Sequence, residues 1–193
     1  MAEATRQFLQ HGYAAVSVDH IVRAAGGSKT MLYAGFGNKQ GLFAAVTERL
    51  CDDFIRDFKQ LNLTGADLAG GLSRLGRSLL AVLLRPEHLA FQRLVIAESA
   101  RFPELGQVWW RQGPAQSRET IARFLGQRQA AGEMRSADPL RAAALFHEML
   151  VSEPVQLGMF QTPPSPRWVD EHIAQVVQVF VHGYGFKGDS PKA

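Results

Sequence analysis

The residues from Gly26 to Thr30 combine two glycines, a serine, a lysine and a threonine, which are groups that can bind phosphate. A nucleotide phosphate loop requires the pattern G-x-x-x-x-G-K-[ST] after a strand. Here Ser28 separates Gly27 from Lys29, no glycine stands five residues before Gly27, and the preceding segment has helical spacing. The segment is therefore not expected to bind a nucleotide.

Two other patterns that could indicate enzyme chemistry are incomplete. The stretch GFGNKQG has Gln40 where the dinucleotide fingerprint G-x-G-x-x-G needs glycine, and the zinc-protease pattern H-E-x-x-H that starts at His147 has Val151 in place of its second histidine. Paired carboxylates or a nucleophile next to a base are also not found at a recognised spacing. The lone cysteine, Cys51, excludes an internal disulfide and a cysteine zinc site. We expect no enzyme activity, no cofactor and no metal.

Composition indicates an ordinary globular protein. The chain has 193 residues, of which 46% are hydrophobic and 20% charged, and a net charge of +3 that is compatible with an anionic partner. Its longest aliphatic run, LLAVLL, is far shorter than the roughly 18 residues of a membrane span, and the N-terminus lacks the apolar core of a secretory signal. We therefore expect a cytoplasmic protein with no membrane partner.

Residues that start and stop helices, and apolar residues at helical spacing, occur along most of the chain, and no alternating strand pattern or repeat is found. A first helix is predicted to stop at Gly12, a second to start at Ser17 and stop at Gly26, a third to start at Ser28, and a fourth to run from about Asn38 to about residue 60. Two short helices joined by a tight glycine turn are typical of a helix-turn-helix motif.

One face of this motif is predicted to contact DNA. Apolar residues would join its two helices, namely Val18, Ile21, Leu32 and Phe36. Polar and flexible side chains would point outward, toward base edges in a major groove. Helix N-termini offer free N–H groups to phosphate oxygens, and a lysine at the fourth helix adds charge. The predicted DNA-binding residues are Ser17, Ser28, Lys29, Thr30, Met31, Tyr33 and Lys39.

The rest of the chain also has helix signals. Pro86 suits a first helical turn, Pro103 predicts the end or a bend of that helix, and Asp138 before a proline predicts the start of another. Pro154 predicts a kink or a break. After a linker at 162–166, the last helix has an apolar stripe made of Val169, Ile173, Val176, Val177, Phe180 and Tyr184, which could be core packing, a dimer interface or both.

Large apolar groups concentrate in this second part and could enclose a ligand pocket, although such groups are core residues by default. The candidate ligand-binding residues are Phe91, Trp109, Trp110, Phe146, His147 and Met149. The pattern predicts an uncharged or weakly charged hydrophobic ligand that touches Phe146 or Met149.

A family resemblance supports these interpretations. Residues 8–46 resemble the DNA-binding domain of TetR-family regulators in the spacing of F, GY, S-V-x-x-I, AAG, S-K, LY, F and x-K-x-x-LF, and the segments LAFQRLVIAESARFPELGQVWW and AAGEMRSADPLRAAALFHEML resemble an AefR-like regulatory domain. The resemblance implies an all-α fold, with an N-terminal three-helix helix-turn-helix DNA-binding domain (1–46) followed by a larger helical ligand-binding and dimerisation domain (47–193).

The same resemblance implies a homodimeric repressor that binds a near-palindromic operator and is released by a small hydrophobic inducer. The sequence departs from the family at Gly27, where valine is usual, and at Ala34 and Gly35, where larger DNA-contacting residues are usual. The alternative is a helical interaction or ligand-binding protein with weakened or lost DNA binding.

Overall fold

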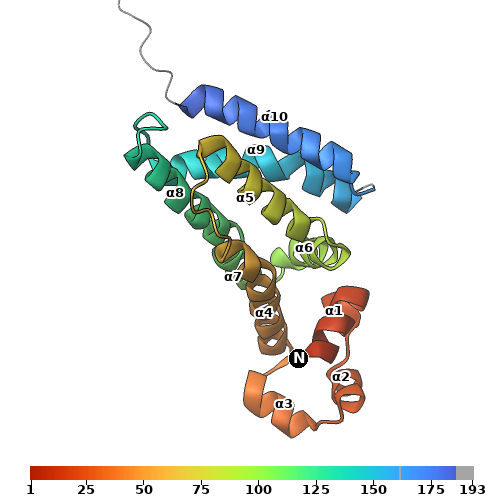
Figure 1. Ribbon diagram of the computed structural model, residues 1–193. Coiled ribbons are helices and arrows are strands. Elements are labelled where there is room, and N and C mark those ends of the chain that lie inside the picture. The colour runs from red at the N-terminus through yellow and green to blue at the C-terminus, as the bar shows by residue number, and fades with distance from the viewer. Residues whose placement is uncertain (161, 186–193) are drawn as a thin grey trace, which may run out of the picture. The chain divides into compact units, whose positions relative to one another are not determined.

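The helices of the described residues are joined by short loops and turns, and α-helix is the dominant secondary structure. This computed structural model describes residues 1–160 and 162–185, apart from the side chain of Asp57, and within them it has ten α-helices and no strand (Figure 1). The all-α prediction is confirmed. The helices are α1 (Ala2–Ala15), α2 (Val18–Ala25), α3 (Lys29–Phe36), α4 (Lys39–Lys59), α5 (Leu68–Leu83), α6 (Pro86–Ser99), α7 (Pro103–Gln112), α8 (Pro114–Ala130), α9 (Pro139–Phe160) and α10 (Pro166–Tyr184). Among these described helices, none has the length and apolar character needed to span a bilayer.

The chain forms two compact units that are each built from two separate segments. The N-terminal unit comprises Met1–Ile55 and Arg85–Pro114, and the C-terminal unit comprises Arg56–Leu84 and Ala115–Ala193. The helices α6 and α7 therefore fold with α1, α2, α3 and most of α4, although residues 56–84 separate the two segments in the sequence.

The first helix is interrupted where the sequence predicts its end. Gly12 has φ 74° and ψ 170°, so the helical backbone stops there although the assigned helix extends to Ala15. A positive φ is accessible to glycine at little cost. The interruption places Tyr13 in the core, where its ring centroid lies 5.0 Å from that of Phe43 and 6.0 Å from that of Phe8.

The core of the N-terminal unit joins α1 to α4, α6 and α7. Phe8 and Phe43 are fully buried, and Phe91 and Leu105 from the later segment belong to the same apolar cluster. At about 25 cal/mol per Å² of apolar surface, these large side chains supply the main stabilisation of the unit. The start of α7 is attached to the first helix by an edge-to-face contact of Phe102 with Tyr13, at 4.6 Å.

The C-terminal unit packs α5, α9 and α10 against one another. The apolar stripe of α10 is mostly buried inside this unit, with Ile173, Val177 and Phe180 at 1%, 6% and 2% exposure. The stripe is therefore core in the protomer. The predicted break at Pro154 does not occur, because α9 continues through that residue to Phe160.

Candidate nucleic-acid interface

The turn between α2 and α3 contains two glycines whose backbone N–H groups both donate to carbonyls of α2. Gly26 has a left-handed backbone (φ 65°), and its N–H donates to the carbonyl of Arg23. The N–H of Gly27 then donates to the carbonyl of Val22 at 3.1 Å. These bonds satisfy orphan carbonyls at the end of α2 and direct the chain into α3. The predicted helix-turn-helix is present at the predicted residues.

The two predicted serine caps differ. The Ser28 hydroxyl accepts a hydrogen bond from the Met31 N–H at 3.2 Å, whereas Ser17 occupies the N-cap position of α2 without a side-chain bond. At Ser17 the first turn of α2 therefore keeps N–H groups that a phosphate oxygen can accept from.

The outer face of α3 is exposed to solvent. No residue of α3 is buried, and Met31 and Tyr33 are 74% and 43% exposed. Its inner side chains, Leu32 and Phe36, are partly buried against the core of the N-terminal unit. The predicted division of α3 into an inner and an outer face matches this arrangement.

The two predicted DNA-binding lysines each have a partner within the protein. Lys29 forms a 2.6 Å ion pair with Asp19 of α2, and both side chains are about half exposed. The Lys39 ammonium donates to the Ala14 carbonyl at 3.3 Å and lies 4.5 Å from the Tyr13 ring centroid. Burial, with a smaller contribution from Arg101, lowers the pKa of Lys39. Lys39 thus connects α4 to the end of α1.

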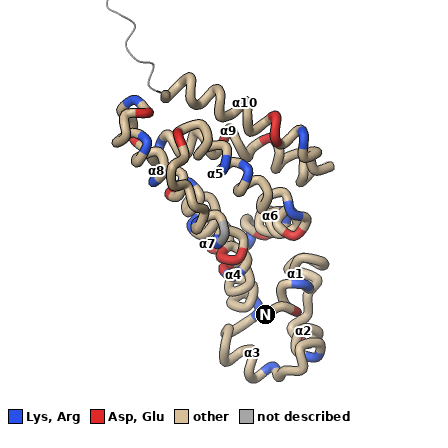
Figure 2. The backbone as a smooth tube through the Cα atoms, viewed as in Figure 1, with Lys and Arg blue, Asp and Glu red and all other residues tan. Residues whose placement is uncertain are grey.

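Arg23 is a residue that the sequence analysis did not propose. Basic residues occur on each of α1, α2 and α3 (Figure 2), and among them Arg6 is bound to Glu3 and Lys29 to Asp19. Arg23 is exposed in the last turn of α2, and within the described residues it has no ion-pair partner. Because it is exposed and unpaired within this part of the chain, Arg23 is a candidate for phosphate contact. The sequence signal that could have identified it is its position just before the turn.

Gly41 is a second residue that the sequence analysis missed. Asn38 caps α4 by accepting from the Gly41 N–H at 2.9 Å, and a Cβ added to Gly41 would lie 2.0 Å from the carbonyl oxygen of Phe36. Only glycine lets the first turn of α4 approach the end of α3 this closely. Gly41 therefore fixes how α3 is presented.

The predicted ligand-binding residues lie in two groups. Phe91, Trp109 and Trp110 belong to the N-terminal unit, and Phe146, His147 and Met149 belong to the C-terminal unit. Phe146 is fully buried and packs edge-on against Phe180, with the ring centroids 5.3 Å apart, while Met149 is 37% exposed.

His147 belongs to a charged cluster in the C-terminal unit. Its Nδ1 lies 3.2 Å from a Glu148 oxygen that also accepts from Arg118 at 2.6 Å. Burial is the largest cause that lowers the pKa of His147. Among the described residues, no group of three metal-ligating side chains converges.

This arrangement defines a helix-turn-helix protein of the kind that regulates transcription, and comparison with known proteins identifies its family. Residues 1–46 match the bacterial regulatory proteins of the tetR family, and residues 70–186 match the C-terminal domain of the AefR-like transcriptional repressors. The chain therefore belongs to the TetR family and has an AefR-like repressor C-terminal domain, as the sequence resemblance predicts.

Individual relatives agree with this assignment. A TetR-family regulator from Mesorhizobium loti is 30% identical, with 96% of this chain and 94% of that chain covered and a TM-score of 0.86. The flavonoid-responsive regulator FrrA is 29% identical, with coverage of 97% and 95% and a TM-score of 0.82. The repressor ComR of Escherichia coli K12 is 48% identical over 52 residues, which span 27% of this chain and only 25% of ComR.

Proposed function

We propose that the protein is a dimeric repressor that binds a near-palindromic operator through α3 and is released by a small, mostly apolar ligand. The observation that carries the proposal is the outer face of α3, which exposes Met31 and Tyr33 while its inner face packs on the core. A lone exposed methionine is common on protein surfaces, but here it lies on the second helix of a helix-turn-helix. That helix enters the major groove in proteins of this class.

Dimerisation is supported by apolar residues that the C-terminal unit leaves exposed. Leu145 and Met149 lie one helical turn apart on α9 and are 51% and 37% exposed, and Val179 on α10 is 56% exposed. The buried stripe of α10 does not supply this surface. A second copy of the chain would cover these side chains and give the operator complex its two-fold symmetry.

Release by an apolar ligand is supported by the chemistry of the candidate residues and by one relative. The candidate residues in both units are mainly aromatic, and FrrA is described as flavonoid-responsive. A ligand shifts the protein away from DNA only if it binds the released arrangement more tightly than the DNA-bound one.

The direct test is to isolate genomic fragments that the purified protein retains, and to footprint them. We expect one protected site with two related half-sites about one helical turn apart. Thr30→Ala should reduce protection of that site, and Thr64→Ala, at an exposed threonine in the loop between α4 and α5, serves as the matched control. Retention of all fragments alike, or of none, would contradict the proposal.

A further inference from the structure

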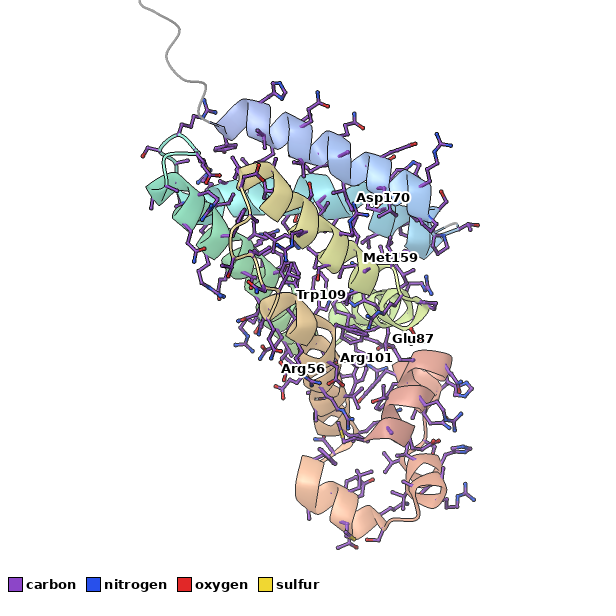
Figure 3. All side chains as sticks on the ribbon, viewed as in Figure 1. Arg56, Glu87, Arg101, Trp109, Met159 and Asp170 are labelled. Atoms are coloured by element: carbon purple, nitrogen blue, oxygen red, sulfur yellow. The ribbon has the colours of Figure 1, made fainter. Side chains whose placement is uncertain are left out.

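A groove in the N-terminal unit lies between α6 and α7 and is unrelated to DNA contact in the proposed function. It has a volume of about 570 Å³, which falls in the range of small-molecule sites. Its lining is mainly apolar, with the polar groups of Ser99, Gln107 and Arg111 at its edges. Trp109, labelled in Figure 3, and Trp110 both contribute to the lining from α7.

The groove leaves large apolar side chains accessible. Ile96 on α6 is 56% exposed and Trp110 is 45% exposed, while Trp109 is partly buried and also contacts the core of the unit. Indole rings present wide, rigid apolar surfaces that suit aromatic ligands. Two adjacent tryptophans beside an exposed isoleucine therefore favour a flat aromatic molecule over a flexible or strongly polar one.

Arg111 adds a charge requirement. It lines the same groove, and within the described residues it has no hydrogen-bond or ion-pair partner. A guanidinium binds carboxylate, sulfonate or phenolate oxygens with charge-assisted hydrogen bonds. We propose that the groove between α6 and α7 binds a planar aromatic compound with one anionic or phenolic oxygen directed at Arg111, and that its occupancy weakens DNA binding.

The start of α7 connects this groove to the helix-turn-helix. The ring of Phe102, just before α7, packs edge-on against Tyr13 at 4.6 Å. In the first turn of α7, Glu104 accepts a hydrogen bond from the Gln40 side chain, one residue after the start of α4. A ligand that moves α7 therefore changes the contacts of both α1 and α4.

Tyr13 extends this connection to the charged end of α4. Its ring centroid lies 4.5 Å from the Lys39 ammonium, and this ammonium also donates a hydrogen bond to the Ala14 carbonyl. All of these residues lie in the N-terminal unit. The predicted effect on DNA rests on the proposed function, whereas the binding site itself does not.

The binding test uses 8-anilinonaphthalene-1-sulfonate as an anionic aromatic probe and N-phenyl-1-naphthylamine as its counterpart without the sulfonate. In a Trp168→Phe variant the groove tryptophans are the sole indoles, because the chain has three tryptophans. We expect one sulfonate dye per protomer to quench their emission. Arg111→Gln should weaken binding of the sulfonate dye about tenfold and leave the affinity for the neutral dye unchanged. Equal loss for both dyes, or for neither, would overturn the role of Arg111.

Filling the groove gives the second arm. Gly106 lies in its wall, and a Cβ there would make an ordinary 3.5 Å contact with Ser99, so Gly106→Ala should fold normally and Gly106→Leu should block the groove. We expect Gly106→Leu to abolish quenching, while Phe160→Ala, which removes a 77% exposed apolar side chain from the C-terminal unit, has no effect. The opposite result would place the dye site in the C-terminal unit and overturn the proposal.

The same variants separate this site from its alternatives. Sedimentation of Gly106→Leu should show an unchanged oligomeric state. A shift to monomers would mean that a second copy of the chain covers the groove. Operator affinity of the parent should fall with the sulfonate dye, and that of Gly106→Leu should not. If the dye binds the groove but DNA affinity is unaffected, the coupling is wrong. If no DNA binds in any condition, the proposed function fails while quenching still decides the site.

Discussion

The carbonyl oxygen of Leu150 on α9 accepts a hydrogen bond from the His172 Nε2 on α10 at 2.9 Å. This carbonyl would normally pair with the N–H four residues later, but that residue is Pro154, which has none. His172 therefore replaces the missing donor, and its ring stacks on Trp168 with the centroids 4.9 Å apart. The bond requires a proton on Nε2. It explains how α9 continues through a buried proline.

A double-mutant cycle tests this relationship. His172→Phe keeps a ring for Trp168 but removes the donor, so it should lower the free energy of unfolding by about 1–3 kcal/mol. In a Pro154→Ala background, α9 regains its own N–H, so the same substitution should cost much less. Urea unfolding of the four proteins measures the coupling. Strictly additive effects would show that His172 does not replace the proline's donor.

Two glycines in the DNA-binding region should respond in opposite directions. Gly41→Ala places a Cβ 2.0 Å from the Phe36 carbonyl oxygen, and the forced shift should cost about 1–3 kcal/mol and weaken operator binding. Gly35→Ala meets no atom within 4 Å and improves helix propensity, so it should stabilise by about 0.5–1 kcal/mol. Thermal unfolding and gel shifts check both. Two similar responses would refute this account of the α3–α4 junction.

The ion pair between Lys29 and Asp19 should limit phosphate binding. Asp19→Asn leaves Lys29 without its carboxylate, so affinity for DNA of any sequence should rise and the salt dependence should steepen by about one phosphate contact. Stability should change little, because the pair is exposed. Anisotropy titrations at several salt concentrations measure this effect. An unchanged salt dependence would mean that Lys29 does not reach a phosphate.

Substitutions in the exposed apolar residues of α9 and in the buried apolar stripe of α10 should have different effects. Leu145→Arg changes a residue that is 51% exposed, so it should give folded monomers that bind the operator poorly. Val177→Arg buries a charge at a residue that is 6% exposed, and it should unfold the unit rather than separate copies. Sedimentation and circular dichroism distinguish these outcomes. Folded monomers from Val177→Arg would instead assign the α10 stripe to the interface.

His88 should make stability depend on pH. It is buried beside Phe54 and Phe91, and its Nδ1 has no hydrogen-bond partner among the described residues. Burial, together with Arg85, lowers its pKa to about 4. The unfolded chain binds the proton near pH 6.5, so stability is complete above that pH and declines by up to about 3 kcal/mol as the pH falls toward 4.

Substitution by Phe provides the check. Urea unfolding at several pH values should show a weaker acid dependence for His88→Phe than for the unmodified protein. Some dependence should remain, because burial also lowers the pKa of His147. An identical decline in both proteins would show that His88 does not titrate in this way.

Local signals predicted the motif well, because their physics is contained in a few neighbouring residues. The Ser28 cap and the left-handed Gly26 depend on bonds within one turn, and Asp138 likewise accepts from the Leu140 N–H at the start of α9. The periodicity of α10 also identified its apolar face. It could not tell whether that face meets the same chain or a second copy, since both bury apolar surface.

What the sequence could not predict depends on residues far apart in the chain. The close approach at Gly41 is set by the Phe36 carbonyl, and the engagement of Lys39 depends on the end of α1. Membership of α6 and α7 in the N-terminal unit was not foreseen either, because it arises from core contacts such as Phe91 and Phe102. Helix signals alone do not reveal which helices pack together.

The most direct test of DNA reading by α3 is selection of binding sites from random DNA with the unmodified protein and with Met31→Ala, compared position by position. We expect a near-palindromic consensus whose base preference changes in the variant at one position in each half-site, while the flanking positions keep theirs. An identical consensus for both proteins, or a changed preference in only one half-site, would contradict the claim that a dimer reads DNA through this helix.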